Sequence, residues 1–456
     1  MSGFSPEQAR QGISLRRALV LGVGLFLTIS ILGYHRWGTI DAIQRLAVTQ
    51  AIVHDGSVLT AEFGPVKYGL TQPVLMIPTY LLGYEAGRLV GSPDPRRVGY
   101  RFTAFFFSPL LVAAMIVLFA RFGARVLGSA GSSVTAALVL FWSTPFLAYS
   151  RLLFTEPLNA FLLLLSFWFL ERSFDDGGKS LPVALGVEVL LALNNLPFTA
   201  ILCATIAFAF LAHPAFRSGP GRLRLGLHAL ASLLVCGGIW AAYDFARYGN
   251  AFQPGYAGET FSNDPLRGLR GLLFSVGRGL FLYAPVVVAA LLAIRSKALR
   301  GWRTRHLALV LGLAFTLLYA SWGSFEGGWC WGPRFLLPFL PLLLLLLVPR
   351  FDALRASARA QRPLDVALVL AGVAVSFLEF LGVYPEYERV MFGSGTVDYV
   401  RSVFEPALSA IAHSWNPERA ISRAPQFLVA VVVSLATGVL TLKADGPPQS
   451  GRISKA

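Results

Sequence analysis

The sequence predicts an all-α, multi-pass transmembrane protein with about twelve membrane-spanning helices. Hydrophobic residues make up 55% of its 456 residues and charged residues 14%, whereas a soluble domain carries about 25% charged residues. This hydrophobic content suffices for about twelve spans of roughly 20 residues. Apolar runs such as 335–348 are continuous, which argues against the alternating pattern of a transmembrane barrel. The composition excludes a soluble enzyme, a coiled coil and a disordered chain.

The charge is strongly positive, with 39 Lys and Arg residues against 24 Asp and Glu residues, a net +15. In a soluble protein this excess would indicate a nucleic-acid partner. In a membrane protein it indicates basic cytoplasmic loops beside an anionic leaflet. We therefore expect membrane lipid, and no nucleic acid, as the partner of these residues. The basic stretch before the first apolar run has no small-residue cleavage site after it, which favours an uncleaved first helix.

The positions of the basic loops predict the topology. Lys and Arg cluster after residue 120 and near 172–179, 217–224, 295–305 and 350–362, and again in the C-terminal tail. If all these loops are cytoplasmic, an even number of spans separates each adjacent pair. This count holds only if 72–90, which contains prolines, glycines and charges, lies in the membrane interface instead of spanning.

We expect both termini of the chain to be cytoplasmic, and we expect no separate soluble domain. We expect a transmembrane core at 1–383, an extracytoplasmic loop at 384–424, and a last helix with a cytoplasmic tail at 425–456. The twelve predicted spans are 15–34, 101–120, 130–149, 155–171, 181–195, 197–212, 225–245, 280–294, 306–322, 334–349, 364–383 and 425–442.

The first outer segment, 35–100, is too long for a simple connection. Apolar residues recur at helical spacing from Asp41 to Val53, which predicts an amphipathic helix with interfacial character. Asp41 at its start is either a helix cap, in a capping box with Gln44, or a general base at the membrane surface. Arg45 lies one turn further on and could pair with Asp41. Lys67 is either a lysine that reaches the lipid headgroups or a phosphate ligand.

Further polar groups gather in the other outer segments. A carboxylate at the depth of Glu156 needs a partner or a water-filled cavity, and Arg151 is one candidate partner. The glycines around Arg278 indicate either a close approach to a ligand or a re-entrant turn. Glu326 and Arg334 bracket a glycine-rich bend whose tryptophans fit an interfacial belt, and Arg334 could bind a phosphate through two oxygens.

These groups all lie on one predicted side of the membrane. A channel or proton relay would instead place ionisable residues along its spans, where Glu188 and Glu379 are the main exceptions here. The pattern favours an active site at the outer surface.

With these motifs in order, the chain resembles the polytopic GT-C glycosyltransferases. The resemblance is to glycosyltransferase family 39 and to the bacterial aminoarabinose-transferase and protein-mannosyltransferase relatives, and it covers most of the chain. Its carriers are Asp41 with its amphipathic helix, the Phe63, Lys67 and Pro73 series, the acidic turn 154–156, the 273–280 segment around Arg278, and 328–335.

The resemblance implies an inverting transfer of a sugar from a polyprenyl-phosphate donor to a glycan, lipid or protein acceptor. The reaction would take place on the extracytoplasmic side of a bacterial inner membrane. Asp41 would be the catalytic base, and Lys67 and Arg334 would bind the donor phosphate. The expected substrate-binding residues are Lys67, Arg334, Glu156, Arg278, Arg45 and Glu326.

The metal requirement and the reaction class keep alternatives open. Relatives often carry an acidic pair where Asp41 is followed by Ala42, which weakens the case for a divalent metal without removing it. The three cysteines have no spacing typical of a disulfide framework or a zinc site. A flippase or exporter of lipid-linked saccharides is the main alternative function, although such transporters usually show inverted repeats, and we find none in the sequence. An oligosaccharide polymerase is a further alternative.

Overall fold

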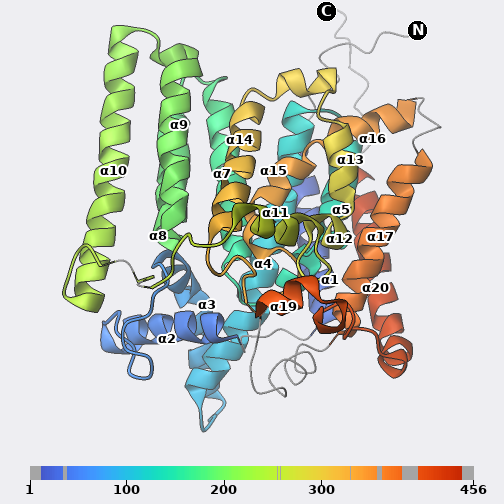
Figure 1. Ribbon diagram of the computed structural model, residues 1–456, viewed down its shortest axis with the longest axis horizontal. Coiled ribbons are helices and arrows are strands. Elements are labelled where there is room, and N and C mark those ends of the chain that lie inside the picture. Colours follow the sequence, from blue (N-terminus) through green and yellow to red (C-terminus); the bar gives the residue numbers. More distant parts are fainter. Residues whose placement is uncertain are drawn as a thin grey trace, which may run out of the picture.

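The computed structural model describes residues 12–33, 39–253, 255–256, 258–328, 330–356, 362–382 and 399–443. Within these ranges the regular structure is helical, apart from one isolated bridge between Thr60 and Gly64. The predicted all-α class is therefore confirmed. Figure 1 shows long helices that run side by side, with shorter helices gathered at one end of the bundle.

Several helices are suited to cross a membrane. Within the described ranges, five are long and apolar enough, and a sixth candidate is a broken pair, 334–344 and 347–354, bent by 46°. The five are α1 (Leu15–Leu32), α4 (Pro95–Val126), α10 (Gly219–Tyr248), α17 (Arg362–Leu381) and α20 (Pro417–Lys443). The chain is an integral membrane protein, while the number of twelve spans stays a prediction.

The other predicted spans coincide with shorter or interrupted helices and with one 18-residue helix that carries three charged residues, Glu156, Glu171 and Arg172. These are α5 (Ala130–Trp142) with α6 (Phe146–Tyr149), α7 (Glu156–Ser173), α8 (Leu181–Asn194), η2 (Leu196–Phe198) with α9 (Thr199–Ala212), α12 (Leu280–Tyr283) with α13 (Val286–Leu292), α14 (Arg305–Ser321), and η5 (Arg334–Phe339) with α15 (Leu340–Leu344) and α16 (Leu347–Ala356). Three breaks coincide with Pro145, Pro285 and Pro338, because proline lacks the amide hydrogen that continues a helix. Short connecting turns are η3 (Pro214–Phe216), η4 (Lys297–Gly301) and η6 (Pro406–Leu408).

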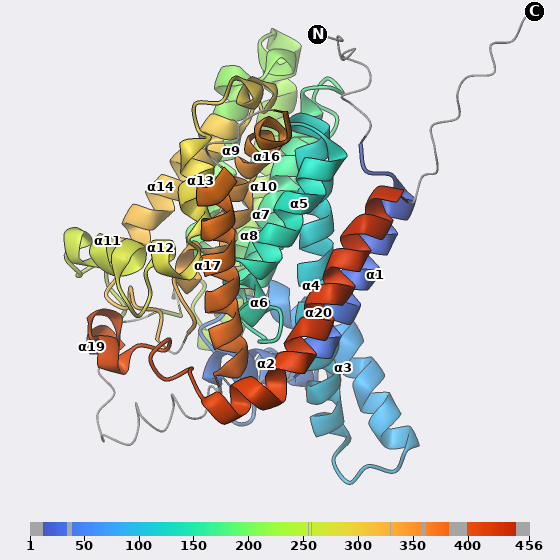
Figure 2. The ribbon, with the colours of Figure 1, turned by 90° about the vertical axis from the view of Figure 1, so that its right-hand side faces the viewer.

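The first and last long helices pack antiparallel along one side of the bundle, as Figure 2 shows. The Arg17 side chain donates to the carbonyl of Leu442 at 3.1 Å, and Gln426 donates to the carbonyl of Ile31 at 2.6 Å. Gly24 lies against Thr437 so closely that a Cβ at position 24 would come within 2.1 Å of its hydroxyl. The start of α1 and the end of α20 therefore lie at the same end of the molecule.

The predicted basic loops meet at that end. Asp175, after α7, accepts hydrogen bonds at 2.7 Å from both Arg125, in the last turn of α4, and Arg303, just before α14. Asp352 on α16 accepts from Ser129 and Ser132 at the start of α5, each at 2.6 Å. The grouping expected from the parity of the spans is thus present in the fold.

The opposite end of the bundle carries α2 (Ile40–Asp55) and α3 (Thr71–Leu89), the two helices expected in the first outer segment. In Figure 1, α2 lies crosswise to the long helices. The α3 helix forms a hairpin with the start of α4, where Gly83 fits against Phe102 and Gly87 against Val98. The helix α19 (Tyr399–Phe404) lies toward the same end, while α11 (Pro265–Phe274) lies across the middle of the bundle in Figure 1. The placement of α3 in the membrane interface stays a prediction. The division of the chain into 1–383, 384–424 and 425–456 also stays a prediction, and residues 384–398 of the second part lie outside the described residues.

The two ends should face opposite sides of the membrane. In a Cys203→Ser background, we expect Ala61→Cys and Ser262→Cys to react with an impermeant thiol reagent added outside intact cells. Ala298→Cys and Ala353→Cys should react only after the membrane is opened, because their segments lie at the basic end. All four positions are exposed. Labelling of Ala61→Cys and Ala298→Cys from the same side would contradict this orientation.

Candidate active site

A cavity of about 480 Å³ opens at the end of the bundle that carries α2. Its wall comes from the start of α2, the 67–68 loop, the start of α7, the segment between α10 and α11, and the 322–335 segment. Six of the seven residues predicted from the sequence line it: Asp41, Arg45, Lys67, Glu156, Glu326 and Arg334. Segments separated by almost 300 positions therefore meet in one polar chamber.

Asp41 is fixed in the first turn of α2 without being its cap. The cap is Thr39, whose hydroxyl accepts a hydrogen bond from the amide of Ala42 at 3.3 Å, so the capping-box interpretation of Asp41 was wrong. The Asp41 carboxylate is free to reach into the cavity. The Tyr68 hydroxyl donates to Oδ1, and Arg334 donates to Oδ2 at 2.9 Å.

The surroundings of Asp41 favour its charged form. Burial alone would raise the pKa of this carboxyl, but the charges of Arg334 and Arg45 and the hydrogen bond from Tyr68 outweigh burial and hold the pKa well below its ordinary value. The Arg45 guanidinium lies over the Tyr68 ring, 3.9 Å from its centroid, and donates a hydrogen bond to the backbone carbonyl of Asp41. Burial, followed by the nearby Asp41 charge, raises the pKa of the Tyr68 hydroxyl.

Arg334 joins two carboxylates from different helices. Its Nη2 donates to Asp41, its Nε lies 2.9 Å from Oε1 of Glu156, and its Nη1 donates to the carbonyl of Gly327 at 3.1 Å. Gly327 has a φ of 70°, and a Cβ there would lie 3.0 Å from the Arg334 side chain. The glycine-rich bend thus leaves room for the guanidinium to reach both acids.

Glu156 does not pair with Arg151, as one interpretation of the sequence proposed. Arg151 instead forms a buried ion pair with Glu379 on α17. Glu156 is 3% exposed, and its Oε2 is buried without a hydrogen-bond partner among the described residues. This oxygen of a cavity-lining residue is an available acceptor for a substrate hydroxyl.

Lys67 is held at the cavity by an ion pair with Glu259, in the segment between α10 and α11. Its ammonium also lies 5.2 Å from the ring centre of Tyr256 and 5.9 Å from that of Tyr68. The Lys67 side chain is 38% exposed, against 14% for Arg334. A ligand that enters the cavity can therefore reach Lys67 more readily than it can reach Arg334.

The loop that carries Lys67 and Tyr68 is fixed by the end of α10. Arg247 donates to the carbonyls of Val66 and Tyr68, and Tyr243 donates to the carbonyl of Tyr68 at 3.1 Å. Asp244 balances the buried charge of Arg247. On the other side, the amide of Leu70 donates to a carbonyl at the end of α8 at 2.9 Å. The loop is therefore held at fixed positions on both sides of Lys67.

Arg278 does not line the cavity, unlike the other six predicted residues, and its role in substrate binding stays a prediction. It is 1% exposed and donates to the carbonyls of Gly277, Glu326 and Gly328. The glycines beside it serve close backbone packing, since a Cβ at position 277 would lie 2.0 Å from the carbonyl of Ser402. Arg278 positions the bend that carries Glu326 and Gly327.

Sequence reasoning missed the aromatic wall of the cavity and the carboxylate of Glu259. Tyr68, Tyr256, Tyr319 and Trp322 line the cavity together with Phe154 and Phe335. The tryptophans of the 322–331 segment do not form one interfacial belt, because Trp331 is buried against Tyr283 while Trp322 lines the cavity, and Trp329 lies outside the described residues. The signal that could have found Tyr68 was its place directly after Lys67.

No group of three or more His, Cys, Asp or Glu side chains is placed to hold a metal ion within the described part of the chain. Three of the acidic residues that line the cavity, Asp41, Glu156 and Glu259, instead contact Arg334, Lys67 or Tyr68.

No protein-family model matches the chain, and no curated protein matches it. The chain is similar to the crystal structure of ArnT from Cupriavidus metallidurans bound to undecaprenyl phosphate. The alignment has a TM-score of 0.49 and 14% sequence identity, and it covers 93% of this chain and 77% of ArnT.

The depressed pKa of Asp41 predicts how its substitution affects stability. Because the folded-state pKa lies below that of the unfolded chain, about 3.9, the carboxylate stabilises the fold at pH values above that and loses this effect as the pH falls further. Asp41→Asn should therefore lower the free energy of unfolding by about 1–3 kcal/mol. The resulting drop in apparent melting temperature should be the same at every pH between 5 and 8.

The difference in apparent melting temperature between the parent protein and Asp41→Asn should shrink only below about pH 4. Thermal unfolding in detergent measures it, and Asp55→Asn, at the exposed far end of the same helix, is the control. A difference that titrates between pH 6 and pH 7 would show a raised pKa and contradict the ion pair.

Proposed function

We propose that the chain is a membrane glycosyltransferase that moves a sugar from a polyprenyl-phosphate donor to an extracytoplasmic acceptor with inversion. One observation carries the proposal: Asp41, on a helix that crosses the end of the bundle, shares a cavity with Lys67 and Arg334. A base and two cations in one chamber are what a transfer from a phosphate-linked sugar requires. The cell membrane that holds the protein would be a bacterial inner membrane.

In the proposed reaction the acceptor hydroxyl oxygen forms a bond to the anomeric carbon and gives its proton to Asp41. The bond between that carbon and the phosphate oxygen breaks, and the polyprenyl phosphate leaves with the electron pair. Lys67 stabilises the negative charge that grows on this leaving group. Attack from the face opposite the phosphate inverts the configuration of the sugar carbon.

The geometry favours different tasks for the two cations. The Arg334 guanidinium donates hydrogen bonds to Asp41 and to the carbonyl of Gly327, and its Nε lies 2.9 Å from Glu156, so a phosphate that binds it has to displace one of these acceptors. Among the described residues, Lys67 pairs with one carboxylate, the partly exposed Glu259. We therefore propose Lys67 as the main phosphate ligand and Arg334 as the residue that orients Asp41 and Glu156.

This arrangement also determines when Asp41 can act as a base. A carboxylate held by Arg334, Arg45 and Tyr68 has little affinity for a proton. A donor phosphate near Lys67 is a second anion that competes with Asp41 for Arg334. We propose that this competition raises the proton affinity of Asp41 only when donor is bound, which limits reaction of the donor with water.

Tyr256, Tyr319 and Trp322 are suited to the sugar. Their rings offer flat apolar faces, and tyrosine and tryptophan also carry a polar group at the edge. The sugar would lie between these rings and the carboxylates of Glu156 and Glu326, which accept hydrogen bonds from hydroxyl groups.

We expect Asp41→Asn to reduce transfer by about 100- to 10,000-fold, because the amide keeps the size of the side chain but cannot take a proton. Donor affinity should not fall, since Arg334 loses its competing carboxylate. The measurement is the rate of sugar transfer from radiolabelled polyprenyl-phosphate sugars by purified protein with a membrane extract. Full activity in Asp41→Asn would exclude it as the base.

Lys67 and Glu259 give opposite expectations for the donor. Lys67→Ala should raise the donor KM by about 10- to 150-fold through the loss of a charge-assisted hydrogen bond. Glu259→Gln should lower the donor KM by about two- to fivefold, since an exposed ion pair no longer competes with the phosphate. Glu85→Gln is the matched control, because Glu85 belongs to an exposed pair with Arg88 elsewhere. An unchanged KM in Lys67→Ala would place the phosphate away from Lys67.

A further inference from the structure

A second concave surface lies between α9 and α10, the pair at the edge of the bundle in Figure 1. This groove has a volume of about 500 Å³. Apart from Arg222 its lining is apolar or small, and it comes from one face of each helix: Cys203, Ile206, Ala207, Phe210, Leu211, Leu225, Gly226, Ala229 and Leu233. Only 17% of the most apolar 18-residue window of α10 is buried, against 50% in α4. The groove therefore faces the hydrocarbon of the membrane and has to be filled by apolar chains.

One end of the groove is positively charged. Arg222 is among its lining residues, and its guanidinium lies 5.5 Å from the ring centre of Phe210, which holds it at the groove. Arg217 is exposed in the turn before α10. In the acidic loop after α7, Asp175 forms ion pairs with Arg125 and Arg303 and not with these two arginines. Neither Arg217 nor Arg222 forms an ion pair with a carboxylate of the described residues.

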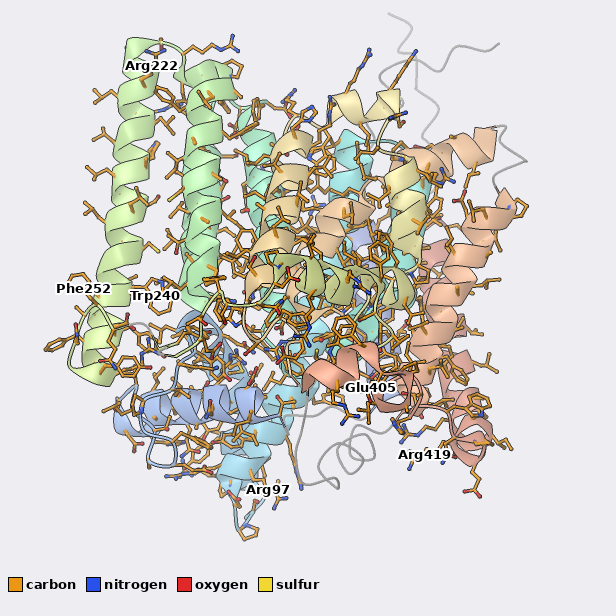
Figure 3. All side chains as sticks on the ribbon, in the orientation of Figure 1. Arg97, Arg222, Trp240, Phe252, Glu405 and Arg419 are labelled. Carbon is orange, nitrogen blue, oxygen red and sulfur yellow. The ribbon has the colours of Figure 1, made fainter. Side chains whose placement is uncertain are left out.

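The groove is separate from the catalytic cavity. Figure 3 shows Arg222 at the end of α10 away from Phe252, which follows the helix. Arg247, near that second end, holds the Lys67 loop. The 25 residues from Arg222 to Arg247 span about 37 Å of helix, more than the roughly 30 Å of a hydrocarbon core. A lipid whose phosphate binds at Lys67 therefore cannot place the same phosphate at Arg222.

We propose that this groove binds an anionic phospholipid of the leaflet opposite the catalytic cavity. The acyl chain lies between α9 and α10, and the headgroup phosphate contacts Arg222 and Arg217. Basic residues beside an apolar groove between helices are suited to an anionic headgroup. The occupant is held by this charge as well as by its chain, which separates it from the zwitterionic lipids around the protein. The proposal does not depend on the glycosyltransferase activity.

The native cysteines allow a direct test. Cys203 lines the groove and is exposed, whereas Cys236 and Cys330 are buried. Purified full-length protein in neutral detergent is titrated with phosphatidylglycerol or with phosphatidylcholine of the same acyl chains. The readouts are the alkylation rate of Cys203, measured on its peptide, and the lipid adducts seen by native mass spectrometry. We expect phosphatidylglycerol to slow alkylation at lower concentration than phosphatidylcholine does.

Two variants locate the headgroup and the chain. Arg217→Gln with Arg222→Gln should weaken phosphatidylglycerol binding by about 25-fold, or about fivefold for each arginine, and remove the preference over phosphatidylcholine. Ala229→Trp should fill the groove and abolish protection by either lipid. The matched control is Arg96→Gln with Arg97→Gln, an exposed arginine pair at the other end of the bundle.

Three results would overturn the proposal. The first is equal protection by both lipids in the parent protein, which would mean that the groove accepts chains without recognising the headgroup. The second is an unchanged preference in the Arg217 and Arg222 double variant. The third is a dimer that protects Cys203 without added lipid, which would make a second copy of the chain the occupant.

Discussion

The site depends on the bridge that Arg334 makes between Asp41 and Glu156. These three residues come from η5, α2 and α7, so one guanidinium fixes the relative positions of three elements that are far apart in the sequence. Arg334 is only 14% exposed, and a buried cation of this kind is stable only with anionic partners. Two carboxylates and a backbone carbonyl meet this need. The arrangement also keeps Asp41 ionised and oriented before any ligand enters.

The segments around this bridge are held in place by hydrogen bonds from buried arginines to backbone carbonyls. Arg278 holds the bend at 326–328 through two of its carbonyls, and Arg247 holds the Lys67 loop through the carbonyls of Val66 and Tyr68. Both arginines are buried, at 1% and 4% exposure. They act on the cavity by positioning the segments that line it, without lining it themselves. Long-range contacts of this kind give an active site on loops the precision that loops alone lack.

The charges divide between the two ends of the bundle according to their task. At the end with α2, Asp41, Glu156 and Glu259 are paired with Arg334 and Lys67 across the cavity. At the other end Asp175 joins several basic loops, and further arginines such as Arg217 and Arg222 remain for the lipid surface. Such a division is what we expect if the proposed chemistry and the basic end that faces an anionic leaflet lie on opposite sides of the membrane.

The sequence by itself determined the helical class, the membrane location and most of the charged residues that line the cavity. Continuous apolar runs and a low charge content leave few alternatives to membrane helices, and each ionisable residue near the end of such a run needs a partner, which brought Asp41, Glu156 and Arg334 to notice. What only the tertiary structure decided was the pairing. Arg151 is near Glu156 in sequence, yet it pairs with Glu379, while Glu156 pairs with Arg334 from much further along the chain. Likewise Thr39, and not Asp41, caps α2, and Arg278 binds carbonyls of its neighbours. The physical reason is that local patterns show which groups need a partner, while the partner itself is set by helix packing between distant segments.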